Sequence, residues 1–249
     1  MPFRKLTTYC LAATAASALA LPAAANLVLN GGFETTTLST KGKFTENDGT
    51  GNVANWTGGQ NKLVYLDFPG TADQPVGVGL IVYGPFPATS PSGGNFVMMD
   101  GDPNFSDPLS QTISGLTIGA SYLLTFNQAA GQEDGFGGHP TTERWSVTFG
   151  SSTQLSNQFS LPDPTGPDLP TPLGPWQSQT MTFVATATSQ VLSFLAVGTP
   201  AGDPPISFLD GIDLEPVVVS AVPEPITASL FGLGLLGLGI ARKRSRRRA

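Results

Sequence analysis

The sequence predicts an all-β protein built as an antiparallel β-sandwich, with a short hydrophobic helix near its C-terminal end. Apolar and polar residues alternate along several short runs, which is the pattern of strands that are buried on one face. Glycine and proline, 30 and 22 of the 249 residues, separate these runs at short intervals. No helical periodicity precedes the C-terminal apolar segment. Short strands in such a series favour a sandwich over other fold classes.

Residues 1–25 have the three zones of a secretory signal peptide. Arg4 and Lys5 supply the positive start, and an apolar stretch over residues 6–21 follows. The small residues 23–25 precede the expected cleavage between Ala25 and Asn26. A membrane helix is the alternative, but the stretch is too short and lacks a stop-transfer flank. We therefore expect export and cleavage by a signal peptidase.

Residues 26–221 form the predicted domain, and residues 26–29 open it with a strand-like run. Alternation is clearest in three runs further along: Tyr122–Phe126, Trp145–Phe149 and Met181–Ala185. Residues 191–197 are more continuously apolar, as in a central strand. The Gly/Pro-rich residues 67–95 predict long loops with one or two strands between them. Residues 157–175 contain six prolines and predict an extended loop.

The end of the chain combines a proline break, a short apolar run and a basic cluster. Residues 222–225 read Val-Pro-Glu-Pro, residues 226–241 are apolar, and residues 242–248 hold six arginines and lysines. A helix of 16 residues rises about 24 Å, which is short of the ~30 Å hydrocarbon core. Such a helix is a marginal anchor. The basic cluster should stay in the cytoplasm, with the domain on the opposite side of the membrane.

This order of parts resembles the PEP-CTERM sorting signal of Gram-negative bacteria, over residues 222–249. Pro223, Glu224 and Pro225 match the motif of that family. The resemblance implies that an exosortase removes the helix, often in species that make exopolysaccharide. We therefore expect export across the inner membrane, transient anchoring there, and release to the cell surface or the extracellular matrix. An ordinary C-terminal anchor is the alternative.

Composition limits the partners of the domain. Between Asn26 and Ala221 there are four basic residues and 17 acidic ones, a formal charge of −13. This charge repels phosphates, so we expect no nucleic-acid partner. It suits cations, and neutral ligands such as sugars. The domain has no cysteine and a single histidine, His139, so neither a thiolate site nor a multi-histidine metal site can form.

A second resemblance concerns the domain itself. Residues 26–34 resemble the opening of galactose-binding-like jelly rolls, a fold common among carbohydrate-binding modules. Residues 109–116 and 122–126 resemble a central pair of strands in that group, and Phe208–Leu214 resembles its closing strand. The resemblance implies a jelly roll.

The same resemblance implies a structural calcium ion, because in many such modules an opening Glu and a closing Asp bind one. These positions correspond to Glu34 and Asp210, and Gly211 stands where the family usually has a second Asp. A hard cation held by oxygen ligands would join two distant segments in a domain that lacks disulfides. A plain hydrogen-bonded pair is the alternative. We expect no other cofactor.

Residues 100–104 imitate the start of an EF-hand loop, but Phe105 and Gln111 replace the required Gly and Glu. We interpret this segment as an acidic turn. A cation site formed by Asp100, Asp102 and Asp107 is the alternative.

Sugar binding directs attention to tryptophan, whose ring stacks on the apolar face of a sugar. Trp56 and Trp176 have polar, loop-like neighbours and are the candidate sugar-binding residues, whereas Trp145 lies in phase with Val147 and Phe149 and is assigned to the core.

Catalysis has little support. The acids Glu133, Asp134 and Glu143 invite a glycosidase hypothesis, but adjacent acids on a strand point apart, and no nucleophile motif accompanies His139. We therefore expect a non-enzymatic, exported, exosortase-processed matrix or surface protein that binds exopolysaccharide. The alternatives are a structural or adhesion protein that binds other proteins, and a glycan-active enzyme.

Overall fold

The computed structural model describes residues 25–44, 52–58, 62–77, 79–136, 138–166 and 174–218. These residues form strands and contain no helix. The strands are β1 (Gly42–Lys43), β2 (Val64–Asp67), β3 (Phe96–Asp100), β4 (Leu109–Ser114), β5 (Ser121–Gln132), β6 (Thr141–Phe149), β7 (Ser152–Leu155), β8 (Phe159–Leu161), β9 (Gln177–Val184), β10 (Ser189–Thr199) and β11 (Pro205–Pro216).

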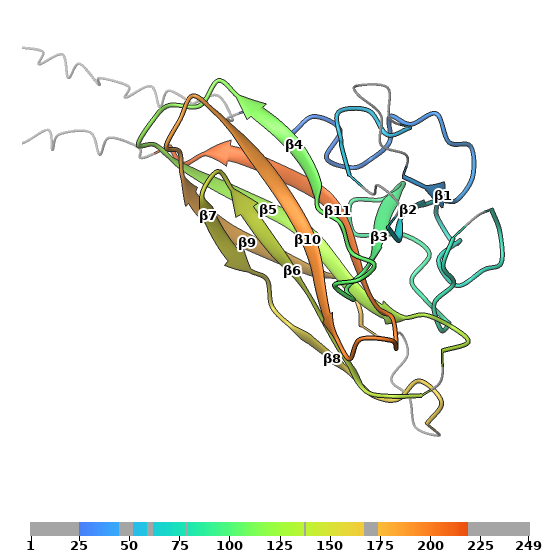
Figure 1. Cartoon of the computed structure of the whole chain (residues 1–249). Coiled ribbons are helices and arrows are strands. Elements are labelled where there is room, and N and C mark those ends of the chain that lie inside the picture. Colours follow the sequence, from blue (N-terminus) through green and yellow to red (C-terminus); the bar gives the residue numbers. More distant parts are fainter. Residues whose placement is uncertain are drawn as a thin grey trace, which may run out of the picture. The chain divides into compact units, whose positions relative to one another are not determined.

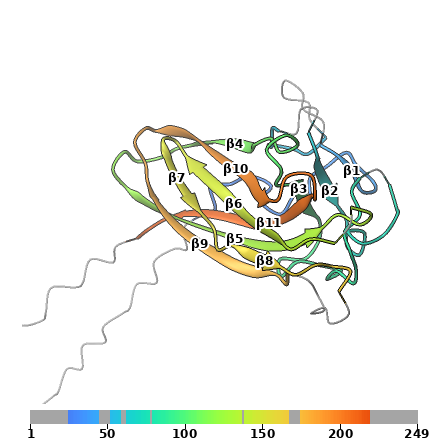
Figure 2. The ribbon, with the colours of Figure 1, turned by 60° about the horizontal axis from the view of Figure 1, so that its bottom comes forward.

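Two antiparallel sheets make up the sandwich (Figures 1 and 2). The six-stranded sheet has the order β1-β2-β3-β11-β5-β9, and the five-stranded sheet has the order β4-β10-β6-β7, with β8 paired to β6. All the strand pairs are antiparallel. The predicted fold class is confirmed by these pairings. The predicted C-terminal helix lies outside the described residues.

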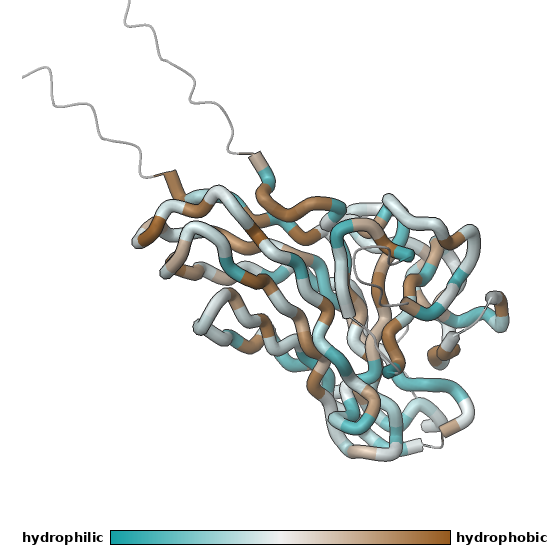
Figure 3. The backbone as a smooth tube through the Cα atoms, turned by 45° about the horizontal axis from the view of Figure 1, so that its top comes forward, coloured by the Kyte–Doolittle hydropathy of each residue, from teal (hydrophilic) through white to brown (hydrophobic). Residues whose placement is uncertain are grey.

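The runs with the clearest alternation are strands. They correspond to β5, β6 and β9, and in β6 each second residue from Thr141 to Phe149 is buried. The apolar run 191–197 lies in β10, between β4 and β6, as expected of a central strand. The closing run is β11, which lies between β3 and β5. Figure 3 shows hydrophobic and hydrophilic segments alternating along the chain.

Four details differ from the predictions. Residues 26–29 form no strand, although Leu27 N donates to Leu214 O at 2.9 Å and so borders β11. The described residues between β2 and β3 contain no strand, only an isolated bridge from Val82 to Glu133. The proline-rich segment contains the short strand β8. The runs read as a central pair, β4 and β5, belong to different sheets.

The main core fills the space between the sheets. It includes Leu124 and Phe126 of β5, Trp145 of β6 and Phe194 of β10. Trp145 is fully buried, as predicted, and its Nε1 donates to the Phe208 carbonyl oxygen at 3.0 Å. Apolar residues from facing sheets thus interdigitate, which is the usual way in which a sandwich buries its inner faces.

A second apolar cluster covers the outer face of the six-stranded sheet. Phe96, Met98 and Phe208 project from β3 and β11, and Leu80 and Phe86 of the long connection between β2 and β3 pack against them. The connection therefore covers the sheet as a folded loop. This explains why β2 and β3 are buried at every position instead of alternating.

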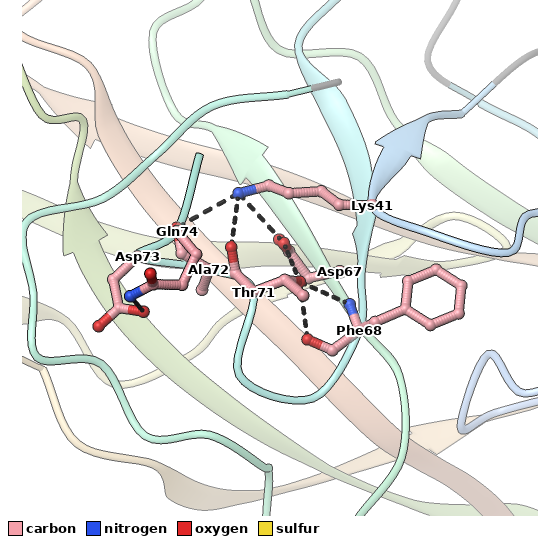
Figure 4. A network of polar contacts seen from close by, with 7 residues as sticks. All are labelled: Lys41, Asp67, Phe68, Thr71, Ala72, Asp73 and Gln74. Carbon is pink, nitrogen blue, oxygen red and sulfur yellow. Dashed lines mark hydrogen bonds and ion pairs between the residues drawn. The ribbon is translucent and has the colours of Figure 1, made fainter. Parts of the chain in front are cut away.

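One buried ion pair fixes this covering loop (Figure 4). Lys41 Nζ lies 3.3 Å from Asp67 Oδ1 at the end of β2, and it donates to the carbonyl oxygens of Thr71 and Ala72 at 3.1 and 3.3 Å. Thr71 Oγ1 donates to Asp67 Oδ1 at 3.2 Å. The ammonium group thus ties the strand to the start of the loop.

The chain divides into two compact units, residues 1–216 and 217–249, and every described strand belongs to the first. None of the described residues forms a helix that could cross a membrane.

Candidate functional site

The structure places the predicted calcium ligands Glu34 and Asp210 close to Gly32. A Cβ at Gly32 would lie 3.8 Å from Asp210 Oδ1 and 3.9 Å from Glu34 Cγ. Asp210 is fully buried and precedes a bulge in β11, where the pairing with β5 shifts register. Glu34 is exposed, and its Oε1 accepts a hydrogen bond from Asn95 N at 2.6 Å.

One oxygen of the Asp210 carboxylate accepts a hydrogen bond, and the other does not. Ser90 Oγ donates to Oδ2, whereas the buried Oδ1 has no hydrogen-bond partner. Burial, together with the nearby charge of Glu34, raises the pKa of Asp210 to about 7, against the lowering effect of hydrogen bonds from Ser90 and Gly211. A buried carboxylate oxygen without a partner, next to a second carboxylate, suits a hard cation.

The ligand set is small. Among the described residues, no three His, Cys, Asp or Glu side chains are arranged so that they could hold a metal ion together. A cation held by Glu34 and Asp210 would therefore need hydroxyl, carbonyl or water oxygens to complete its coordination. With that addition, the residues present fit calcium.

The prediction for Trp56 is corrected by its burial. Its side chain is only 4% exposed, its Nε1 donates to the Asn30 carbonyl oxygen at 2.9 Å, and its ring packs against Phe33 and Phe194. The polar neighbours that indicated a loop are real, but the ring turns away from them into the core. A sugar cannot stack on it.

Trp176 is half-buried at the margin of the outer apolar cluster. Its ring lies edge-on to Phe96 at 5.6 Å and to Phe86 and Phe208 at 6.3 Å each, and its buried Nε1 has no partner. Most of this side chain therefore helps to hold the covering loop. Sugar stacking on its remaining surface stays a prediction.

The acidic turn is as interpreted from the sequence. Asp102 Oδ1 accepts from Asn104 N at 2.8 Å, and Oδ2 accepts from Gly202 N at 2.9 Å, so this carboxylate holds two loops. Asp100 Oδ1 accepts from Asp102 N at 2.7 Å, and burial raises the pKa of Asp100 to about 6. Both oxygens of Asp102 are thus occupied by backbone donors.

The acids of the glycosidase hypothesis differ in exposure. Asp134 is exposed, Glu133 is half-buried, and Glu143 is fully buried on the inner face of β6. Burial raises the pKa of Glu143 to about 8, although Thr141 Oγ1 donates to its Oε1. Burial and the charge of Asp100 raise the pKa of Glu133 to about 7. The carboxyl group of Glu143 is therefore closed off from a solvent-borne substrate.

A small pocket, which the sequence did not predict, opens where β5 leads toward β6. Its walls include Gln132, Glu133, Phe136, His139, Thr141 and Asp203. His139 Nδ1 lies 3.1 Å from Asp203 Oδ2, and the Phe136 side chain is 50% exposed. The signal in the sequence was an aromatic residue and a histidine among glycines and acids directly after a strand.

The outer face of the five-stranded sheet is rich in hydroxyl groups. We call the outward side chains of this sheet the hydroxyl face; they are partly or fully exposed. They are Ser110, Thr112 and Ser114 of β4, Thr142, Arg144, Ser146 and Thr148 of β6, Thr153 and Leu155 of β7, Ser160 of β8, and Ser189, Val191, Ser193, Leu195, Val197 and Thr199 of β10. Arg144 is the only charged residue among them.

One row of this face, extended by Thr57 in the segment beside β4, crosses the sheet without interruption. Thr57, Ser110, Ser193, Thr148 and Thr153 are consecutive partners across neighbouring segments. Adjacent strands lie about 4.8 Å apart, so the row extends about 19 Å. Hydroxyl contacts of 3.1 Å between Thr57 and Ser110, and of 2.8 Å between Thr148 and Thr153, align its ends.

Comparison with protein families identifies the C-terminal segment. Residues 221–247 match the PEP-CTERM protein-sorting motif, which confirms the resemblance seen in the sequence. The chain is thus an exported protein with a sorting signal that anchors it transiently before processing. Pro223, Glu224 and Pro225, like residues 1–24, lie outside the described residues, whereas Ala25 and Asn26 are described and exposed. Comparison with curated proteins finds no match.

Among solved structures, carbohydrate-binding modules are similar in fold. TmCBM61 in complex with beta-1,4-galactotriose has 15% identity and a TM-score of 0.40, covering 77% of this chain and 99% of that chain. A Family 16 Carbohydrate Binding Module-2 has 14% identity and a TM-score of 0.36, covering 76% and 99%. A CBM4 structure has 15% identity and a TM-score of 0.34, covering 76% and 98%. Likenesses this distant identify no ligand.

Proposed function

We propose that this chain is a non-enzymatic protein of the cell surface or extracellular matrix that binds exopolysaccharide through the hydroxyl face. An exosortase would first remove the C-terminal sorting segment, and a signal peptidase the N-terminal one. The observation that carries the binding proposal is the neutrality of the hydroxyl face. In a domain with 17 acidic and four basic residues, this whole face carries no carboxylate and one arginine.

The chemistry of the face suits a polyhydroxylated partner. Each hydroxyl group can donate and accept a hydrogen bond, so a row of them can match the hydroxyl groups of an extended sugar chain. A nucleic acid would require clustered basic residues, and a stable protein interface would require a more apolar centre. A neutral, flat, hydroxyl-bearing surface therefore favours polysaccharide over both.

A non-enzymatic role is supported by the state of the acids. Glu143 and Asp210, whose pKa values are raised to about 8 and about 7, are fully buried, and Asp102 accepts backbone hydrogen bonds with both oxygens. A glycosidase requires two carboxyl groups that reach a substrate from opposite sides.

The proposal includes a structural calcium ion at Glu34 and Asp210. The ion would offset the two like charges and would satisfy Asp210 Oδ1, which is buried and otherwise without a partner. Its role would be to fix the opening segment of the domain against β11.

Retention of the exported protein in gels that contain the exopolysaccharide of the producing strain tests the binding proposal. Ser193→Glu and Thr148→Glu each place a carboxylate in the middle of the hydroxyl row and should reduce retention at least about tenfold, equivalent to ~1.4 kcal/mol. Thr180→Glu is the matched control, because Thr180 is exposed on β9 of the other sheet.

The outcomes separate the alternatives. If wild-type protein is not retained by any polysaccharide, the binding function is wrong and the structural or adhesion role is preferred. If all three variants are retained like wild type, the hydroxyl face is not the binding surface. Release of shorter chains from a reducing-end-labelled polysaccharide would instead establish an enzyme.

A further inference from the structure

One end of the sandwich has turns without charged residues. Three turns meet there, as Figures 1 and 2 show: residues 115–120 join β4 to β5, residues 150–151 join β6 to β7, and residues 185–188 join β9 to β10. Gly119 N donates to the Ala185 carbonyl oxygen at 2.8 Å, and Gly150 N donates to that of Val191 at 2.9 Å. The turns contain no Asp, Glu, Lys or Arg. We call these three turns, together with Pro216 at the end of β11, the exit end.

Three apolar side chains are exposed at or beside the exit end. Ile118, at 63%, is the most exposed large hydrophobic side chain among the described residues, and Val184 and Leu123 are 51% and 37% exposed. Val184 pairs with Ser121 and Leu123 with Thr182, so Leu123 and Val184 are diagonal neighbours on the outer face of β5 and β9. The turn that carries Ile118 borders Ala185, the residue after Val184. These side chains gain free energy if an apolar partner covers them.

The opposite end of the sandwich is acidic. The loops after β3, β5 and β10 meet there, because Asp102 Oδ2 accepts from Gly202 N at 2.9 Å and Glu133 N donates to the Pro204 carbonyl oxygen at 3.2 Å. We call these loops the acidic end; their acids are Asp102, Asp107, Glu133, Asp134 and Asp203, and they contain no Lys or Arg. Charge is therefore distributed unequally along the sandwich.

The sorting segment follows directly from the exit end. β11 ends at Pro216, which pairs with Tyr122 next to the turn 115–120, and the sorting motif begins at residue 221. The apolar run expected to enter the membrane begins at residue 226, and ten residues of extended chain reach at most about 35 Å. A strand of 12 residues such as β5, which runs from the exit end to the acidic end, is about 40 Å long. The linker is therefore shorter than the distance from its attachment point to the acidic end.

We propose that the exit end of the anchored domain rests on the phospholipid surface, with Ile118, Leu123 and Val184 in contact with lipid. Apolar side chains gain free energy at the boundary between headgroups and acyl chains. The acids that anionic headgroups would repel lie at the far end, beyond the screening length of about 8 Å at physiological salt. One acid opposes the contact: Glu215, which pairs with Leu123.

A small apolar contact is sufficient in the anchored protein. The linker keeps the exit end at a high effective concentration beside the bilayer, so the contact needs little affinity of its own. The contact would fix the orientation of the domain and keep the linker near the membrane surface, where the enzyme that removes the helix must reach it. This inference uses the transient anchoring of the chain and does not depend on polysaccharide binding.

The test places the unprocessed chain, from Asn26 to the end, in vesicles of phosphatidylcholine with a minor fraction of phosphatidylglycerol. This chain has no cysteine, so Thr186→Cys at the exit end and Ala201→Cys at the acidic end can each carry one fluorophore; both positions are exposed. Phospholipids with a nitroxide near the headgroup should quench the label at position 186 at least about threefold more strongly than the label at position 201.

Ile118→Asp should reduce the quenching at position 186 about threefold, because a carboxylate at this position is repelled by the lipid surface. Phe136→Asp is the matched control. It introduces the same charge in place of a side chain that is 50% exposed, but in the loop after β5 at the acidic end, and should leave the quenching unchanged. Glu215→Gln should increase the quenching, because it removes the acid beside Leu123.

Three outcomes would overturn the proposal. Equal quenching at positions 186 and 201 would show that the exit end does not face the lipid. Unchanged quenching in the Ile118→Asp variant would show that the linker alone keeps the domain near the bilayer. Quenching that disappears when the vesicles hold few protein molecules would assign the exit end to contact with a second copy of the chain. Circular dichroism of each variant excludes unfolding as the cause of a change.

Discussion

Lys41 and Asp67 form an ion pair of 3.3 Å in which both side chains are almost completely buried, 1% and 0% exposed. The pair lies beneath the loop that covers the outer face of the six-stranded sheet. Burial raises the pKa of Asp67 to about 6, against the lowering effects of Lys41 and Thr71. The carboxylate is therefore ionised at neutral pH only because its partners are present.

Lys41→Met should leave Asp67 as an uncompensated buried charge and lower the free energy of unfolding at pH 7.5 by about 3–5 kcal/mol. At pH 5 the loss should be smaller, because Asp67 then folds in its protonated, neutral form. Urea unfolding at both pH values measures this. Adding Asp67→Asn to Lys41→Met should recover part of the loss at pH 7.5, and an equal loss at both pH values would contradict the account.

Calcium should stabilise the domain through Asp210. At a calcium concentration 100 times the dissociation constant, the expected gain is about 2.7 kcal/mol, or roughly 5–10 °C in melting temperature for a domain of this size. Asp210→Asn should abolish the gain, and Asp134→Asn should not. Differential scanning calorimetry of chelated and calcium-loaded protein checks this, and a gain that survives Asp210→Asn would place the ion elsewhere.

Glu143 should make stability fall as the pH rises. Its pKa is raised to about 8 in the folded protein, so the folded state holds a proton that the unfolded state has released above about pH 4.3. This advantage is complete at low pH, and it is lost as the pH rises toward 8. Glu143→Gln should therefore match wild type near pH 4 and exceed it at pH 9 by up to about 5 kcal/mol.

Urea unfolding at several pH values compares the two curves. The stability of the Glu143→Gln variant should still fall as the pH rises, but less steeply, because the pKa values of Glu133 and Asp210 are also raised to about 7. Parallel curves for wild type and Glu143→Gln would show that the pKa of Glu143 is the same in the folded and unfolded protein.

Trp56 should matter for folding and not for polysaccharide binding. Trp56→Ala removes a core ring and its hydrogen bond to Asn30, and should cost about 3–5 kcal/mol of stability. Gel retention of the folded fraction should match wild type, and Trp56→Phe should restore part of the stability. Loss of retention in a well-folded Trp56→Phe protein would return Trp56 to the list of sugar-binding residues.

The strands that could be predicted from the sequence are those with one buried face and one solvent-exposed face. Trp145, Val147 and Phe149 alternate with polar residues, so the two-residue period of a strand could be recognised in the sequence. The short strand β8 was missed because Phe159 and Leu161 give too brief a pattern among prolines. The one or two strands expected within residues 67–95 are absent from the described part of that segment before β3, where Leu80 and Phe86 pack on the sheet without pairing to it.

Candidate site residues could be predicted only where a single residue stands at a position that is recognisable from a known family. The resemblance to galactose-binding-like jelly rolls singled out Glu34 and Asp210, and the structure places both close to Gly32, while calcium binding there stays a prediction. Trp56 misled because local polarity does not reveal the direction of a side chain after Asn55, whose φ of 67° turns the chain. The pocket was missed because Gln132 and Asp203 lie far apart in sequence.

The position of β11 between β3 and β5 bears on how the protein is secreted. A chain that crosses the membrane from its N-terminus delivers this central strand last, so the six-stranded sheet waits with two open edges until residue 216 has emerged. The sorting motif begins at residue 221. The strand that completes the sheet and the sorting motif therefore leave the membrane almost together, so the domain can close only when its export is nearly finished.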